Sequence, residues 1–179
     1  MDKLQLSYHW QSPLINEAPI TGELPASLAA RLSREKAMAL ADQYPAHLII
    51  GCDQVASLGN EILGKPGNHQ AAARQLSLSS GQVVTFITGL SLLNSATGHC
   101  QTITDQFRVT FRELTSSQID NYLDREKPWD CAGSFKSEGL GIALFSKLEG
   151  NDPNSLIGLP LIRLIDLLAH EGVHPLGQG

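Results

Sequence analysis

Apolar positions in the first third of the chain pass from helical to strand spacing. Leucines recur every four residues over 24–32, and Pro25 suits the first position of a helix that we expect to run to about Gln43. A short apolar run at 48–50 then predicts a buried strand that ends at Gly51. The first regular elements are therefore expected to be a helix and a strand.

Polar residues that follow this strand are the first candidates for chemistry. Asp53 and Gln54 would emerge at its carboxyl end, where ligands of α/β proteins usually bind. The two-residue turn Gly59-Asn60 predicts a hairpin over 54–63, which leads to Lys65 between a glycine and a proline. A carboxylate at one end and a lysine at the other suit a phosphate substrate with a divalent cation. The alternative is a surface hairpin with a solvated lysine.

The remaining apolar patterns alternate between helices and paired strands. Asn68 can cap a second helix, and Thr115 with Gln118 forms a capping box for a third helix. We further expect strands over 83–93, 101–111 and 140–148, a polar loop over 127–139, and a buried final helix from Pro160 to Gly172. Hairpins interspersed with helices predict an α/β fold whose mixed β-sheet is flanked by helices.

Composition restricts the class of protein. The 179 residues are 42% hydrophobic and suffice for a single domain, 1–179, with a full core. A net charge of −5 argues against nucleic acid as the main partner but allows a small anionic ligand at a local basic cluster. The three cysteines have no paired spacing, so neither a disulfide framework nor a zinc site is indicated. Without a long apolar run or a signal sequence, we expect no membrane contact and a cytoplasmic location.

Two charged residues outside the hairpin unit each have two readings. Glu17 lies in a turn-forming stretch and is either a solvated loop acid or a second carboxylate of a site. Lys36 lies one turn beyond Leu32, at the edge of the buried face of the first helix. It is either a lysine with a solvated ammonium group or a phosphate ligand.

Residues 170–174 match the zinc-protease pattern H-E-x-x-H, but we do not interpret them as a metal site. The pattern requires both histidines on one continuous helix, and Gly172 is expected to end the helix between them. We therefore favour a solvated helix end.

Several short segments, spread over nearly the whole chain, together match one known sequence pattern. They are Asn16-Glu17, Arg34-Glu35-Lys36-Ala37, Gly51-Cys52-Asp53-Gln54, Gly64-Lys65-Pro66, Thr88-Gly89, AGSFKSEG at 132–139, and residues 154–160. Together these segments resemble the Maf family of nucleoside triphosphate pyrophosphatases. They look most like its subfamily that acts on N7-methylated GTP.

This resemblance implies a fold, a reaction and a set of site residues. The implied fold is a twisted sheet with two lobes around a cleft, similar to inosine triphosphate pyrophosphatase. The implied reaction is hydrolysis of the α–β phosphate bond to a monophosphate and pyrophosphate, with Mg²⁺ or Mn²⁺, often in a homodimer. Asp53 falls on the family's catalytic proton acceptor, and Glu17, Lys36 and Lys65 fall on its substrate-binding residues. Asp53 and Glu17 are also the candidate metal ligands.

Two further residues fall on positions that separate subfamilies. Gln54 and Glu138 match the methyl-GTP subfamily, whereas the subfamily that takes dTTP and UTP has Thr after the aspartate. Methylation at N7 makes guanine cationic, so an acidic Glu138 near the base would favour that cation. Gln54 can hydrogen-bond an edge of the base.

Two departures from the family pattern leave an alternative open. The family's first strand and its Arg-containing phosphate loop have no counterpart in this sequence, and Asn16 stands where the family has Asp. The pattern therefore predicts either a methylated-nucleotide pyrophosphatase weakened by this loss, or a nucleotide-binding protein that has lost turnover and has a regulatory role. The retained Asp53, Lys36 and Lys65 favour the enzyme.

Overall fold

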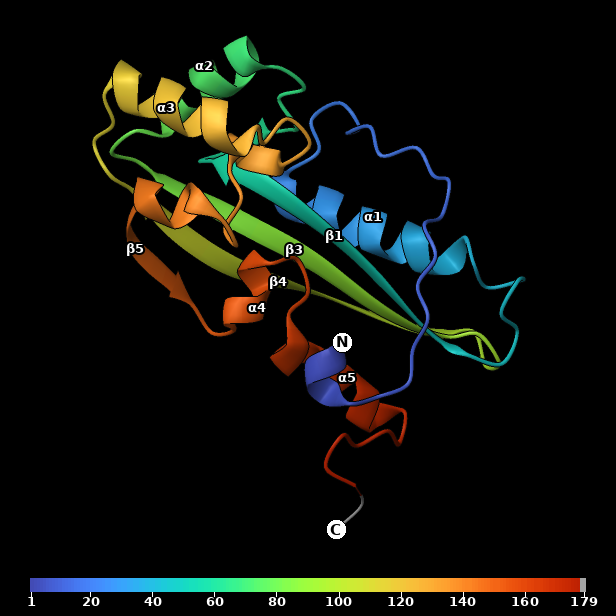
Figure 1. Ribbon diagram of the computed structural model, residues 1–179. Helices are drawn as coiled ribbons and strands as arrows, with labels where there is room; N and C mark the ends of the chain where they lie inside the picture. The colour runs from blue at the N-terminus through green and yellow to red at the C-terminus, as the bar shows by residue number, and fades with distance from the viewer. Residues whose placement is uncertain (178–179) are drawn as a thin grey trace.

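A five-stranded antiparallel sheet forms the centre of the molecule (Figure 1). The computed structural model describes residues 1–177. The strand order is β2-β1-β3-β4-β5, with β1 at Leu48–Leu58, β2 at Glu61–Leu63, β3 at Val83–Asn94, β4 at His99–Phe111 and β5 at Phe145–Gly150. The expected helix-flanked α/β fold is confirmed. Each strand pairing described is antiparallel, although mixed directions were expected. Short hairpins join β1 to β2 and β3 to β4, and strands joined by a hairpin are antiparallel.

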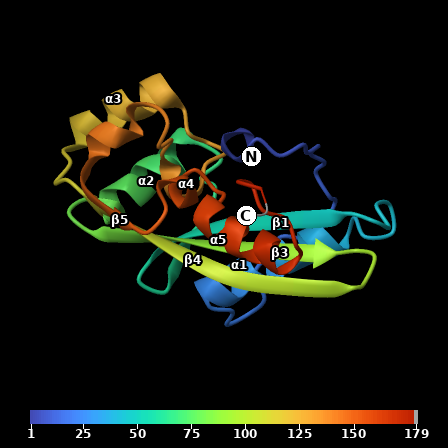
Figure 2. The ribbon, with the colours of Figure 1, turned by 90° about the horizontal axis from the view of Figure 1, so that it is seen from below.

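Helices cover both faces of this sheet, as Figure 2 shows. One face carries α1 (Pro25–Met38), and the other carries α2 (His69–Ser79), α3 (Ser116–Glu126), α4 (Pro153–Leu156) and α5 (Leu161–His170). The second face has separate apolar clusters, with α2 and α3 at one end and α5 at the other. Within residues 1–177, no helix combines the length and the apolar character needed to cross a membrane.

Side chains of the strands alternate between the two faces of the sheet. Val55 and Ile87 pack beneath Leu28 of α1. Ala56 follows Val55 and Phe86 precedes Ile87, so both side chains point to the opposite face. There they pack in the apolar cluster formed with α2 and α3. Consecutive residues of β1 therefore belong to different sides of the molecule.

The helix α1 approaches the sheet closely because two glycines lie beneath it. A Cβ added to Gly51 would lie 2.0 Å from the backbone oxygen of Ser33, and one added to Gly89 would lie 2.0 Å from that of Ala29. Both distances are far shorter than a van der Waals contact, so a larger residue would displace the helix from the sheet. The glycines thus allow polar side chains of α1 to reach β1.

Three local sequence signals are confirmed by the structure. Asn68 caps α2, Thr115 and Gln118 form the capping box of α3, and β1 and β2 form the expected hairpin. The prediction of a strand ending at Gly51 was wrong, because β1 continues unbroken to Leu58. Its pairing with β3 along its whole length carries the strand past the glycine.

The first helix and the last strand are shorter than expected. The helix α1 ends at Met38 rather than near Gln43, and irregular turns follow it. The strand β5 begins only at Phe145, because Leu140–Leu144 form a 3-10 turn. In that turn the Leu140 N–H donates to the Glu126 carboxylate at 2.8 Å and not to a neighbouring strand.

The helix α5 ends at His170, as the position of Gly172 predicted. Gly172 has a left-handed backbone (φ +75°) that does not continue a helix. The Glu171 carboxylate accepts a hydrogen bond from Asn94 Nδ2 at 2.7 Å and lies 3.0 Å from His99 Nδ1. These contacts tie the end of α5 to the β3–β4 hairpin, so the prediction of a solvated helix end was wrong at Glu171, whose side chain is 10% exposed.

Candidate active site

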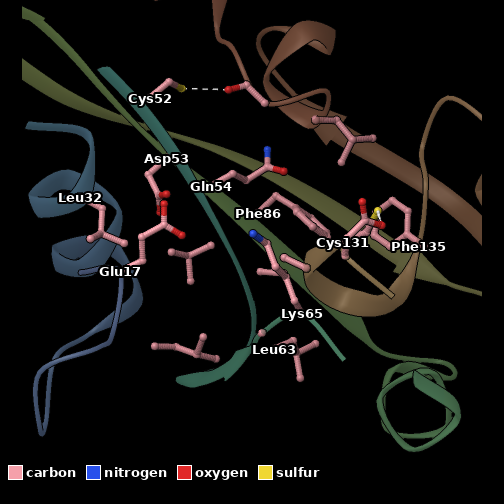
Figure 3. A pocket seen from close by; sticks show the side chains of 18 of the residues that line it. Glu17, Leu32, Cys52, Asp53, Gln54, Leu63, Lys65, Phe86, Cys131 and Phe135 are labelled. Atoms are coloured by element: carbon pink, nitrogen blue, oxygen red, sulfur yellow. Dashed lines mark hydrogen bonds between the residues drawn. The ribbon is translucent and has the colours of Figure 1, made fainter. Parts of the chain in front are cut away.

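All six residues predicted for the site line one cavity of about 540 Å³. They are Glu17, Lys36, Asp53, Gln54, Lys65 and Glu138. The cavity follows the edge of β1, since β2 pairs only with its last three residues. Its walls are α1, the segment after β2, the loop at 130–138 and the residues after α4, and Figure 3 shows it from close by.

Asp53 and Gln54 reach this cavity from opposite faces of the sheet. Asp53 shares the face of Val55, beneath α1, and Gln54 shares the face of Ala56. Asp53 therefore lies in the middle of a long strand and not, as predicted, at the carboxyl end of a short one. The cavity has access to both faces because it lies along the strand edge.

Lys36 joins two carboxylates on the α1 side of the cavity. Its Nζ lies 2.6 Å from Oδ1 of Asp53 and 2.7 Å from Oε1 of Glu17. The side chains of Lys36 and Asp53 are 20% and 12% exposed, whereas that of Glu17 is 49% exposed. The Lys36 ammonium is therefore paired with two carboxylates and not freely solvated, and its role as a phosphate ligand stays a prediction.

Burial and charge act together on the pKa values of these three groups. Burial raises the pKa of Asp53, although the hydrogen bond from Lys36 opposes the shift. Burial also disfavours the Lys36 ammonium, but the bonds to Asp53 and Glu17 outweigh it and raise the pKa of Lys36. The bond from Lys36 lowers the pKa of Glu17. Asp53 is thus the carboxylate that takes up a proton more readily.

Lys65 lines the same cavity as Lys36 and its two carboxylates, and it lies in the segment that follows β2. Figure 3 shows its ammonium directed into the cavity. Two hydrogen bonds hold this segment, one from Gln75 Nε2 to the Gly64 carbonyl at 3.0 Å and one from the Gly67 N–H to the Trp129 carbonyl at 2.9 Å. The cavity therefore presents a second lysine to an anionic ligand.

Aromatic side chains line another part of the cavity, and the sequence pattern did not single them out. The rings of Phe86 and Phe135 meet edge to face, with centroids 5.0 Å apart. The loop that carries Phe135 also contributes Cys131 and the predicted Glu138. The family-like segment 132–139 was the available signal for Phe135, whereas Phe86 carried no signal beyond its strand pattern.

Asn16 and Cys52, which precede Glu17 and Asp53 in the sequence, form hydrogen bonds that stabilise the local fold. Asn16 accepts the Ala18 N–H at 3.0 Å in a local turn and does not line the cavity. The thiol of Cys52 donates to the Gly158 carbonyl at 2.9 Å, and burial raises its pKa to about 12. Cys52 is therefore a neutral thiol beside Asp53.

Comparison with known proteins places the chain in one family. The chain matches the family described as Maf-like protein over residues 1–171, and it belongs to the Maf family. It is 59% identical over 173 residues to a protein of Alcanivorax borkumensis named 7-methyl-GTP pyrophosphatase, a match that covers 97% of this chain and 88% of that protein. A Pseudomonas putida protein of the same name is 56% identical over 171 residues, covering 96% and 89%. The resemblance inferred from the motifs is confirmed.

The raised pKa of Asp53 leads to a prediction about pH. Asp53 is predicted to be the general base, which works only when deprotonated, so we expect kcat/KM to fall as the pH falls through the raised pKa of Asp53. The acidic limb should therefore lie above the ordinary aspartate value of 3.8. In Lys36→Met, which removes the cation that opposes the shift, the limb should move to still higher pH. A pH profile of kcat/KM for both proteins measures this, and a limb at or below the ordinary value would contradict it.

Proposed function

We propose that this protein hydrolyses N7-methylated GTP to the monophosphate and pyrophosphate. The observation that carries this proposal is the convergence of Lys36, Lys65 and two carboxylates on a cavity that also holds Gln54 and two aromatic rings. The Maf family membership and the names of the two relatives support the same reaction.

The two lysines bind the triphosphate. Their ammonium groups are compact positive charges for phosphate oxygens, and both line the cavity. An incoming triphosphate competes with Asp53 for the Lys36 ammonium. Binding of the substrate therefore weakens the ion pair and frees the Asp53 carboxylate to accept a proton.

Asp53 acts as the general base. A water molecule attacks the α phosphorus, its proton passes to the Asp53 carboxylate, and pyrophosphate leaves as the α–β bond breaks. Base assistance of this kind is worth about 10²–10⁴-fold in rate. The lysines stabilise the negative charge that develops on the leaving pyrophosphate.

A divalent cation fits the same carboxylates. Glu17 and Asp53 both contact the Lys36 ammonium, at 2.7 and 2.6 Å, so the two carboxylates flank one position that a positive charge occupies. Magnesium is commonly bound by one or two carboxylates together with substrate phosphates. Glu17 and Asp53 would hold Mg²⁺ or Mn²⁺, which when bound neutralises phosphate charge.

We expect the double variant Gln54→Thr/Glu138→Ala to lose most of the preference for N7-methylated over plain GTP. It removes a carboxylate that favours a cationic ring and an amide that hydrogen-bonds the base, each worth about 10-fold. The ratio of kcat/KM for the two substrates measures the preference. Asp124→Ala, which removes an exposed carboxylate of α3, is the control. An unchanged ratio in the double variant would show that these residues do not read the base.

Identification of the products tests the proposed reaction. N7-methyl-GTP incubated with the protein and Mg²⁺ should give equal amounts of monophosphate and pyrophosphate. Diphosphate with inorganic phosphate would instead indicate attack at the γ phosphorus. Nucleotide binding without turnover would favour the binding protein considered as the alternative.

A further inference from the structure

A row of polar side chains crosses three strands behind Gln54. Gln54 of β1 lies opposite Thr88 of β3, and Thr88 lies opposite Asp105 of β4. Thr88 and Asp105 are only 1% and 5% exposed. Polar groups buried on an otherwise apolar face require hydrogen-bond partners, so the contacts of this row determine how its members are oriented.

The segment α4 supplies those partners. The Ser155 carbonyl accepts a hydrogen bond from Gln54 Nε2 at 2.6 Å and one from Thr88 Oγ1 at 3.4 Å. Gln54 Nε2 also donates to Thr88 Oγ1 at 3.1 Å. The Ser155 hydroxyl donates to Oδ2 of Asp105, and the Arg163 guanidinium lies 3.9 Å from the other oxygen of that carboxylate. Asp105 thereby anchors α4 to β4.

These contacts determine which way the Gln54 amide points. A backbone carbonyl can only accept a hydrogen bond, so the amide atom beside the Ser155 oxygen must be the nitrogen. That nitrogen lies 2.6 Å from the Ser155 oxygen and 3.1 Å from Thr88 Oγ1, so its donor capacity is directed at these two acceptors. The oxygen Oε1 is the polar atom that Gln54 retains for a ligand in the cavity that Gln54 lines (Figure 3).

We propose that Asp105 is a positioning residue for base recognition. The hydrogen bond from the Ser155 hydroxyl to Asp105 fixes α4, and with it the Ser155 carbonyl that orients the Gln54 amide. Gln54 then offers the base a hydrogen-bond acceptor and no donor. Asp105 does not line the cavity, and its effect passes through Ser155. This inference rests on the proposed function, because it assumes that a nucleotide base occupies the cavity next to Gln54.

An acceptor at this position discriminates between purines. Guanine carries N1–H and 2-amino donors on its pairing edge, whereas adenine has an unprotonated N1 there. An acceptor facing adenine N1 leaves two lone pairs opposed, and such mismatches are rejected strongly in a site built for hydrogen bonding. Methylation at N7 withdraws electrons from the ring and strengthens the N1–H donor. The same acceptor therefore favours the methylated guanine.

The test compares N7-methyl-GTP with ATP, using both kcat/KM and calorimetric affinity. Ser155→Ala and Asp105→Val each remove one half of the anchoring contact. We expect each to lower the preference for N7-methyl-GTP about 10-fold, through a higher KM with little change in kcat. Asp105→Asn keeps an acceptor for the Ser155 hydroxyl and should retain the preference. The control is Ser79→Ala, which removes another fully buried hydroxyl, one bonded to the Gln75 carbonyl outside the row.

An unchanged preference in folded Ser155→Ala or Asp105→Val would overturn the proposal, as would a loss of preference in Ser79→Ala of equal size. If neither anchoring variant folds, Thr88→Val decides. It keeps the side-chain shape and removes the second acceptor of the Gln54 amide, so an unchanged preference would overturn the orientation of Gln54. Failure of the wild-type protein to turn over any nucleotide would contradict the proposed function alone, because the calorimetric preference still tests the positioning.

Discussion

Replacing Asp53 with asparagine should lower kcat on N7-methyl-GTP by at least about 10²-fold while leaving nucleotide affinity within a few-fold. The amide has the shape of the carboxylate but does not accept a proton from water at neutral pH. It retains an acceptor for Lys36, whose ammonium lies 2.6 Å from Oδ1 of Asp53. Pyrophosphate release measures turnover, and calorimetry measures binding.

The matched control is Asp42→Asn, the same chemical change at an exposed position beyond α1. It should leave both turnover and affinity unchanged. Turnover by Asp53→Asn close to that of the wild type would show that Asp53 is not the base. Loss of nucleotide binding together with turnover would show that Asp53 contributes mainly to holding the substrate.

Gly89→Ala should destabilise the protein by about 3 kcal/mol or more, equivalent to a fall in Tm of about 6–12 °C for a chain of this length. The added Cβ would lie 2.0 Å from the carbonyl oxygen and 2.4 Å from the carbonyl carbon of Ala29. These are backbone atoms of α1, so the helix itself must move. Because Lys36 is on the same helix, its ion pair with Asp53 should also be disturbed and activity should fall.

Gly64→Ala is the control for stability. An added Cβ there meets nothing within 4 Å and requires no left-handed backbone, so we expect a change within about 0.5 kcal/mol. Urea unfolding of both variants and the wild type gives the comparison. Equal stability of Gly89→Ala and Gly64→Ala would contradict the close contact between α1 and the sheet.

Elements with local signals were predictable from the sequence. The cap at Asn68 and the capping box at Thr115 depend on residues within one turn of helix, and both are present. Gly51 shows the opposite case. A glycine after an apolar run suggests the end of a strand, but here it makes room for Ser33 of α1, a contact that no local pattern contains.

The members of the site were predictable from the family resemblance, but their arrangement was not. The motifs named Asp53, Lys36 and Lys65, and all three line the cavity. The placement of Asp53 in mid-strand depends on long-range pairing of β1 with β3, which spacing along the chain does not reveal. The divalent cation, the homodimer and the cytoplasmic location stay predictions.

The row behind Gln54 was also beyond sequence analysis. It exists only because the strand registers place Thr88 and Asp105 beside Gln54 and because α4 folds over them. In the sequence, Asp105 is one polar residue of a strand with alternating polarity. Its connection with Ser155 appears only in the folded chain.

A substrate panel tests most directly whether this cavity belongs to a methyl-GTP pyrophosphatase. The kcat/KM for pyrophosphate release is measured with Mg²⁺ on N7-methyl-GTP, GTP, ATP, dTTP and UTP. We predict the highest value for N7-methyl-GTP, at least about 10-fold above that for GTP. The reason is that Glu138 favours the cationic ring and Gln54 hydrogen-bonds the edge of the base. A highest value for dTTP or UTP, or no pyrophosphate from any of the five, would contradict it.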